Sequence, residues 1–486
     1  MNLICFTYHE VSLFKRLYDS MLTKPVGKYF FILVIIFCSR GLAAQTAISL
    51  KEAVKTALDN YGTIKSKNSY AAASRSAAAY TRSEYLPNMN VAGQWTYGTV
   101  NGQIGPGYGF GGLTVASSGL PSPVQGWDAA FGAIYLTNIN WDFFAFGRVK
   151  ERIKTAEAIA IRDQKDLEQE TFEHSVKVTA AYLNLLTAQR LRLSYEKNLI
   201  RARAVETVVT TRAKNGLIAG VDSLLANAEV SNARIAITRA RDLEQEQSNQ
   251  LAVLMGVPPT EFVLDTMFIA RLPGLLEELS LANIESHPTL QFFKSRILAG
   301  ESQLRYYKTL YFPAFSVVGV FQTRGSGFGN SYSTNRTDFT HNPWEGFSPT
   351  RSNFLLGLGV TWNLTQPIRY SHQVRSQELV NKALLEEYNL ANQRLNAQLE
   401  LASSKIRNAL ENYREAPIQV EAAADAYLQK SVMYQNGLTN LVELNQTLYA
   451  LIRAETDRDI AGNSVWQSLL MRAAAMGDYT IFENQL

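Results

Sequence analysis

The sequence predicts an α+β membrane protein built by internal duplication, with long coiled-coil helical hairpins and four β-strands in one chain. Three observations predict this fold class. The two halves of the chain match each other at a nearly constant spacing. Each half contains two segments in which apolar and polar residues alternate. Each half also contains a helical pattern far longer than an ordinary globular helix, so the fold is extended.

Composition and charge narrow the class of protein. The chain has 486 residues, of which 46% are hydrophobic and 19% are charged, which is typical of a folded rather than a disordered chain. The formal net charge is +4, and residues 1–44 carry +3 of it. The near-neutral remainder argues against nucleic acid as a partner, because that requires a basic surface. The two cysteines, Cys5 and Cys38, precede residue 45, which excludes disulfides and cysteine-based sites from the rest.

The N-terminal region has the pattern of an export signal. An apolar run from Tyr29 to Cys38 follows two lysines and precedes small residues that end at Ala44. This pattern is typical of a secretory signal peptide, and the run is too short to span a membrane. We expect residues 1–44 to be a signal peptide with an N-terminal extension, cleaved after Ala43 or Ala44.

The internal duplication defines the expected domain organisation. Matched motifs recur 226 or 221 residues apart, namely Tyr85-Leu86-Pro87 with Tyr311-Phe312-Pro313, Asn215-Gly216-Leu217 with Asn436-Gly437-Leu438, and Met255-Gly256 with Met476-Gly477. We therefore expect a first repeat at 45–256, a linker at 257–272, a second repeat at 273–477 and a tail at 478–486.

Each repeat begins with a half-length helix and continues with two strands. The helices are expected over Ser49–Leu86 and Leu275–Phe312, where a following proline ends each one. Alternation of apolar and polar residues predicts strands at 88–97, 129–143, 315–321 and 353–364. The loops between the strands of each pair, at 98–126 and 323–352, are rich in glycine, serine and asparagine, so we expect them to be exposed and mobile.

Aromatic side chains lie toward the ends of these strands. Trp95, Trp141 and Trp362 occupy apolar positions of the alternation. Tryptophan in such positions is typical of the membrane–water interface of an outer-membrane barrel. We interpret these three residues as membrane-interface anchors rather than as groups that stack on a ligand.

The longest helices follow the strands. No proline or glycine interrupts Arg148–Lys214, and Arg369–Gln435 contains only Pro417, where we expect a kink or a local irregularity. A helix of this length extends on the order of 100 Å. Each ends at an Asn-Gly-Leu turn, and a shorter helix returns over Val221–Met255 or Val442–Met476.

Physical constraints on these strands and helices predict that they form a conduit. Four strands cannot close a barrel, and open strand edges are not tolerated in lipid, so one chain supplies only part of a barrel. A dimer of eight strands would fill its own interior, whereas a trimer of twelve leaves a lumen. The long helices, packed side by side, could form the wall of a tube that continues the barrel.

The sequence resembles the TolC family of outer-membrane efflux ducts. The resemblance depends on an ordered and duplicated set of segments: 48–58, Tyr85-Leu86-Pro87, 141–148 and the paired Asn-Gly-Leu turns. It implies a homotrimer with a 12-stranded barrel in the outer membrane of a Gram-negative bacterium and a periplasmic helical tunnel. It also implies a passive exit duct of a tripartite efflux or type I secretion system, with outer-membrane lipid, a periplasmic adaptor (membrane fusion) protein and an inner-membrane transporter as partners.

The resemblance also assigns roles to the periplasmic tip. The family's gate acids fall six positions after each tip glycine, at Asp222 and Glu443, and its gate tyrosine matches Tyr434. Thr439 stands where the family's prototype has arginine, and Gln446 replaces a second acid, so the gate ion pairs differ here. A different interpretation of both acids is that the helix dipole favours them in a first turn. The tip turns would contact the adaptor; they comprise Asn215, Gly216, Leu217, Asn436, Gly437 and Leu438.

No pattern for catalysis or cofactor binding is present in the sequence. Gly107–Gly112 formally matches a dinucleotide fingerprint but lies between two strands with no helix after it. The five histidines lack ligand spacing, and the sequence shows no phosphate-binding loop or nucleophile elbow. We expect no enzyme activity, metal or cofactor. The alternative function is a soluble periplasmic coiled-coil scaffold with β-hairpin interaction modules.

Overall fold

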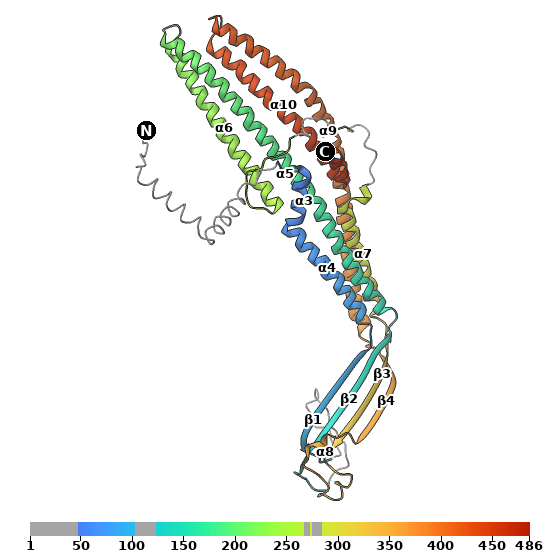
Figure 1. The fold of residues 1–486 in the computed structure, drawn as a ribbon. Helices are drawn as coiled ribbons and strands as arrows, with labels where there is room; N and C mark the ends of the chain where they lie inside the picture. Colours follow the sequence, from blue (N-terminus) through green and yellow to red (C-terminus); the bar gives the residue numbers. More distant parts are fainter. Residues whose placement is uncertain (1–46, 103–122, 267–272, 275–283) are drawn as a thin grey trace, which may run out of the picture.

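The computed structural model describes residues 47–102, 123–266, 273–274 and 284–486. The expected signal peptide, the glycine-rich segment 107–112 and residues 267–272 of the expected linker lie outside these residues. The described chain is elongated, with two helical hairpins at one end and a β-sheet at the other (Figure 1).

In both halves a helical segment, two strands and a long helical hairpin follow one another in this order, and the second half also contains α8 between its strands and α11 at its end. The first half contains α3 (Leu50–Asn60), α4 (Gly62–Ser83), β1 (Asn88–Thr99), β2 (Ala129–Phe144), α5 (Arg148–Lys214) and α6 (Gly220–Met255). The second contains the 3-10 helix η2 (Ile284–Ser286), α7 (Pro288–Thr309), β3 (Ala314–Ser326), α8 (Pro343–Phe347), β4 (Arg351–Thr361), α9 (Gln366–Gln435), α10 (Leu441–Met476) and α11 (Thr480–Glu483).

The four strands form one antiparallel sheet in the order β1-β2-β3-β4. Trp141 of β2 lies opposite Val317 of β3, so the central pairing joins the two halves of the chain. The register shifts between Asp142 and Phe144, which marks an irregularity where β2 approaches α5. Among the described residues, β1 and β4 each have one neighbouring strand, so the sheet of one chain is open at both edges.

The long helices agree with the sequence prediction. α5 spans Arg148–Lys214 as expected, because no proline or glycine interrupts it. α9 begins three residues earlier than expected and continues through Pro417 without a break. Figure 1 shows α5 with α6 and α9 with α10 as two antiparallel hairpins, named here the first and the second hairpin.

Two sequence predictions about shorter segments were wrong. The helix expected over Ser49–Leu86 is interrupted, because Tyr61 has an extended backbone (φ −64°, ψ 121°) that ends α3 and begins α4. The Tyr61 ring stacks on buried His174 of α5 at 3.8 Å, and neither residue type predicts a helix break. The loop expected at 323–352 is partly ordered, since β3 continues to Ser326 and α8 packs on the sheet.

A hydrophobic core lies where the two hairpins meet α3 and the C-terminus. Fully buried side chains of α5, α10 and α11 dominate it, including Tyr182, Trp466 and Phe482. The Tyr182 hydroxyl lies 2.8 Å from the carbonyl of Ile48 and 3.1 Å from that of Asp265, which ties two loop segments to the core. Within the described residues, no helix is both long and apolar enough to cross a membrane.

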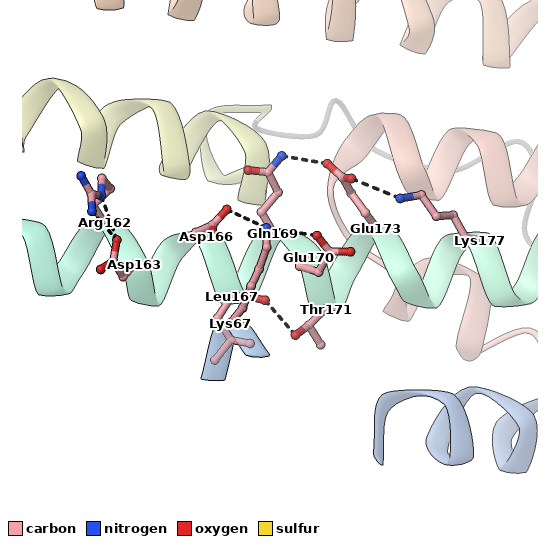
Figure 2. A network of polar contacts seen from close by, with 10 residues as sticks. All are labelled: Lys67, Arg162, Asp163, Asp166, Leu167, Gln169, Glu170, Thr171, Glu173 and Lys177. Atoms are coloured by element: carbon pink, nitrogen blue, oxygen red, sulfur yellow. Dashed lines mark hydrogen bonds and ion pairs between the residues drawn. The ribbon is translucent and has the colours of Figure 1, made fainter. Parts of the chain in front are cut away.

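Polar contacts join the helices between this core and the sheet. Lys67 of α4 reaches across to α5, with Nζ 2.9 Å from a carboxylate oxygen of Asp166 and 3.1 Å from one of Glu170 (Figure 2). Burial alone would lower the pKa of Lys67, but the two carboxylates outweigh it and raise that pKa. α4 is therefore attached to α5 by a charge-assisted network.

Candidate functional site

The tips of the two hairpins lie at the end of the molecule farthest from the sheet (Figure 1). Gly216 and Gly437 have φ of 72° and 77°, in the left-handed region that favours glycine. In each turn the amide of the following leucine bonds a carbonyl five residues earlier, at 2.9 Å. Leu217 and Leu438 are therefore presented in equivalent positions, with 67% and 71% of their surface exposed.

Glu443 is held by three side chains of the second hairpin. Its Oε2 lies 2.6 Å from Nζ of Lys430 and accepts a 2.7 Å hydrogen bond from the Thr439 hydroxyl. Its backbone amide donates to Oδ1 of Asn440, which caps α10. These bonds, chiefly the one from Lys430, lower the pKa of Glu443. Thr439 is therefore a direct partner of this acid.

Asp222 occupies the equivalent position in the first hairpin without equivalent partners. The residues that match Lys430, Thr439 and Asn440 are the apolar Val209, Ile218 and Ala219. Among the described residues, no hydrogen bond or ion pair of the Asp222 carboxylate is seen. The two tip acids therefore differ, because in the described part of the chain Glu443 forms an ion pair with a lysine and Asp222 does not.

Tyr434 lies inside the contact between the hairpins. Its side chain is 5% exposed and packs with Val209, Ala226 and Leu444. Burial raises the pKa of Tyr434, and the charge of Asp222 raises it further. The structure thus brings Tyr434 and Asp222 near each other, whereas Glu443 interacts within its own hairpin.

Arg212 connects the two hairpins at Tyr434. Its Nη1 donates a 2.8 Å hydrogen bond to the Tyr434 carbonyl, and its guanidinium lies 5.7 Å from the centre of the Tyr434 ring. This contact joins α5 to α9. No pattern in the sequence selects Arg212, because the contact depends on how the hairpins pack.

Two further contacts join the hairpins away from the tips. Arg201 of α5 forms a two-pronged ion pair with Glu455 of α10, at 2.8 and 2.6 Å. This pair lowers the pKa of Glu455 despite its partial burial. The Tyr449 hydroxyl of α10 donates to the buried carboxylate of Glu229 on α6, and the pKa of Tyr449 rises to about 12, through burial first and this carboxylate second. The hairpins of one chain are thus held together by several polar contacts.

The two faces of the sheet differ in polarity, since one is largely apolar and the other mixes polar and apolar residues. Residues directly opposite each other in an antiparallel sheet share a face. One face carries rows such as Met89–Ile139–Gly319–Leu356, whereas the other carries rows such as Asn90–Asn138–Val320–Leu355 and Asn88–Asn140–Val318–Gly357. Leu356, Leu358 and Phe354 of the first face are each at least 77% exposed in the single chain. We name this first face the apolar face of the sheet.

Of the three tryptophans interpreted as anchors, Trp95 and Trp141 lie on the apolar face, and Trp362 directly follows β4. Trp141 donates its indole N–H to the Tyr85 carbonyl at 2.9 Å, and Trp362 donates to the Tyr311 carbonyl at 3.1 Å. Because Tyr85 and Tyr311 are matched residues of the two repeats, the same contact occurs twice at the helix-proximal end of the sheet. Trp95 lies nearer the other end and donates to the Tyr135 hydroxyl at 3.0 Å.

The histidines and carboxylates of the described residues do not form a cluster of metal ligands. Within the part of the chain that the structure describes, no group of three or more histidine, cysteine or carboxylate side chains could hold a metal ion. His174 and His287 are buried and contact backbone carbonyls through Nε2. These two buried histidines therefore stabilise the fold.

A family of known proteins matches part of this chain. Residues 53–257 match the family model described as outer membrane efflux protein. No curated protein sequence matches the chain.

Solved channels share the fold over most of the chain. The outer-membrane channel OprN has a TM-score of 0.70 at 17% identity, over 88% of this chain and 89% of that one. VceC from Vibrio cholerae has a TM-score of 0.69 at 14% identity, over 88% and 96%. CmeC from Campylobacter jejuni has a TM-score of 0.68 at 12% identity, over 88% and 85%. The chain is therefore similar to the outer membrane efflux protein family over residues 53–257, and it shares the fold of solved outer-membrane channels over most of its length.

Proposed function

We propose that three copies of this chain form a passive exit duct through the outer membrane. The observation that carries the proposal is the four-stranded sheet, which is open at both edges and has one strongly apolar face. Lipid around such a sheet requires other strands to pair with β1 and β4, and copies of the same chain can supply them in a closed ring. The family match to outer membrane efflux proteins favours the same arrangement.

The helices would continue the pore into the periplasm. α5 and α9 are 67 and 70 residues long, so each extends about 100 Å. Packed around a threefold axis, the hairpins would enclose a tunnel that receives substrate from an inner-membrane transporter through a periplasmic adaptor. The duct itself would use no energy source, and the family is one of channels rather than enzymes.

The hairpin tips would form the gate and the adaptor contact. In a trimer, Asp222 and Glu443 would place six carboxylates around one opening, of which the Glu443 set is paired with Lys430. The unpaired Asp222 set would favour cations at the entrance. The contact of Arg212 with Tyr434 would hold the hairpins of one chain together in the closed tip. Exposed Leu217 and Leu438 would offer the adaptor paired apolar contacts.

Two questions remain beside this proposal, namely a soluble scaffold as the alternative function and the kind of cargo that a duct would carry. A soluble periplasmic scaffold would need polar groups on both faces of the sheet, which the exposed leucines and tryptophans of the apolar face do not provide. Within the duct function, small-molecule efflux and type I protein secretion use the same architecture. The names of the similar structures, which are outer-membrane channels, favour neither cargo.

Reconstitution of the purified protein in a planar bilayer tests the proposal. We expect discrete conductance steps with a preference for potassium over chloride, and we expect Asp222→Asn to reduce that preference. Leu217→Ser serves as a control at the same tip that changes no charge. A protein that inserts and never conducts, even after Arg212→Ala, would contradict an exit duct.

A further inference from the structure

α8 lies on the apolar face of the sheet. Phe347 of α8 makes an edge-to-face contact with Phe131 of β2, with ring centres 5.4 Å apart. The Tyr135 hydroxyl donates a 3.1 Å hydrogen bond to the Phe347 carbonyl. Phe131 pairs with Tyr97, and Tyr135 pairs with Gly93, so both belong to the same face as Val91, Trp95 and Ile139. The loop between β3 and β4 therefore folds toward the side of the sheet that the proposed function assigns to lipid.

Two glycines make this packing close. A Cβ atom on Gly346 would lie 2.5 Å from the Phe131 carbonyl oxygen, and a Cβ atom on Gly325 would lie 2.5 Å from the Ser348 carbonyl oxygen. Such distances exclude a side chain at either position unless the backbone moves. α8 is thus fixed directly on β2 and β3. These are the central strands, so α8 lies away from β1 and β4, where copies of the chain would meet.

The position of α8 along the strands matches a membrane boundary. Phe131 lies ten residues before Trp141 on β2. At about 3.3 Å per residue and a tilt of about 40°, this separation corresponds to roughly 25 Å across the bilayer, which is the height of the apolar band of outer-membrane barrels. Trp141 and Trp362 lie at one edge of that band. Trp95, Tyr97, Phe131 and α8 lie at the other edge.

The chemistry of α8 suits the boundary between lipid and water. Trp344 is 80% exposed on this short helix, next to Pro343 and to the exposed Glu345. Its backbone is satisfied within the segment, because Asn342 Oδ1 accepts from the Trp344 amide at 3.1 Å, and the Ser348 amide and hydroxyl both donate to the Trp344 carbonyl. Self-contained hydrogen bonding allows a backbone segment to contact lipid.

We propose that α8 is an outer-leaflet anchor, in which Trp344 inserts into the interface between lipid headgroups and acyl chains. The proposal rests on the outer-membrane location in the proposed function. The occupant is lipid, because α8 is continuous with the apolar face and distant from the edges where another copy would pair. A consequence is that α8 does not lie on the face of the sheet that would line the lumen.

Tryptophan fluorescence tests this anchor in the full-length particle. Trp127 is a matched control, since it is 81% exposed and lies before β2 at the same end of the sheet. The particle is reconstituted in phosphatidylcholine vesicles with brominated acyl chains, which quench tryptophans in contact with lipid. If Trp95, Trp141, Trp344 and Trp362 contribute equally, Trp344→Phe removes about a quarter of the lipid-quenched emission, and Trp127→Phe removes none of it.

Iodide in the aqueous phase provides the complementary measurement. We expect the emission lost in Trp344→Phe to be insensitive to iodide and the emission lost in Trp127→Phe to be quenched by it. Lipid-quenched emission that is the same in Trp344→Phe and wild type overturns the anchor but keeps the membrane location. A wild-type particle with no lipid-quenched emission overturns both the anchor and the proposed function.

Discussion

Nζ of Lys430 lies 2.6 Å from Oε2 of Glu443, across the tip turn of the second hairpin. The matched residues of the first hairpin are Val209 and Asp222, so only one of the two tip acids has a lysine partner. The duplicated sequence thus produces an asymmetric tip.

This asymmetry predicts how charge at the tip sets ion selectivity. Lys430→Ala would leave three further carboxylates unpaired in the trimer, so the preference for potassium over chloride should rise roughly twofold in planar bilayers. Lys405→Ala removes an exposed lysine of the same helix and should leave the ratio unchanged. An equal effect of the two substitutions would mean that total charge, and not the Lys430–Glu443 pair, governs selectivity.

The ion pair between the hairpins predicts measurable energetic coupling. In a double-mutant cycle of Arg201→Ala and Glu455→Ala, thermal unfolding should give a coupling free energy of about 1–2 kcal/mol, because the pair is two-pronged and partly buried. The same cycle on Arg453 and Asp457, which are exposed on one helix, should give less than about 0.5 kcal/mol. Coupling near zero for Arg201 and Glu455 would contradict the contact.

Buried His287 predicts a loss of stability in mild acid. Its Nδ1 accepts from the Thr289 amide at 3.1 Å and caps α7, and its Nε2 donates to the Ala474 carbonyl at 3.0 Å. Burial lowers the pKa of His287, so the folded state favours the neutral ring. Neutral His287 therefore stabilises the folded state above the ordinary histidine pKa of about 6.5. This stabilisation is lost as pH falls below that value.

The unfolding temperature of the particle measured between pH 8 and pH 5 tests this. His174 has the same direction of shift, with burial as the largest cause, and is expected to contribute as well. His287→Asn keeps a capping side chain and should flatten part of the pH dependence. His372→Asn alters an exposed residue and should not change it. Parallel pH profiles for wild type and His287→Asn would refute the role of His287.

The Tyr182 hydroxyl predicts a stability effect far from the pore. Tyr182→Phe leaves the carbonyls of Ile48 and Asp265 without this donor in the core, and should lower the free energy of unfolding by about 1–3 kcal/mol. Tyr70→Phe removes a hydroxyl from a 65% exposed residue and should change it by less than about 0.5 kcal/mol. Chemical denaturation of the detergent-solubilised particle gives both values.

The sequence predicted the long helices and strands closely, because they depend on local patterns. α5 has the predicted bounds since nothing in 148–214 disfavours a helix. The break at Tyr61 was missed because the stacking of its ring on His174 is a tertiary contact. α8 was missed because its order comes from close packing of Gly346 on β2, and glycine in a sequence indicates a turn as readily as a contact.

The candidate site was predictable in part. The tip glycines and acids follow from the duplicated turns and the family resemblance. Lys430 lies seven residues before Gly437 and Glu443 lies six after it, so their contact could have been deduced from hairpin geometry. Arg212 and Arg201 could not have been selected, because their partners lie on the other hairpin and depend on packing between hairpins.

The central claim is that three open sheets close one barrel in the outer membrane. The most direct measurement is fractionation of native cells followed by the mass of the detergent-extracted particle. The account predicts a particle of three mature chains that separates with the outer membrane. A soluble monomer or dimer in the periplasm would contradict it, since the apolar face of the sheet would then need a different partner.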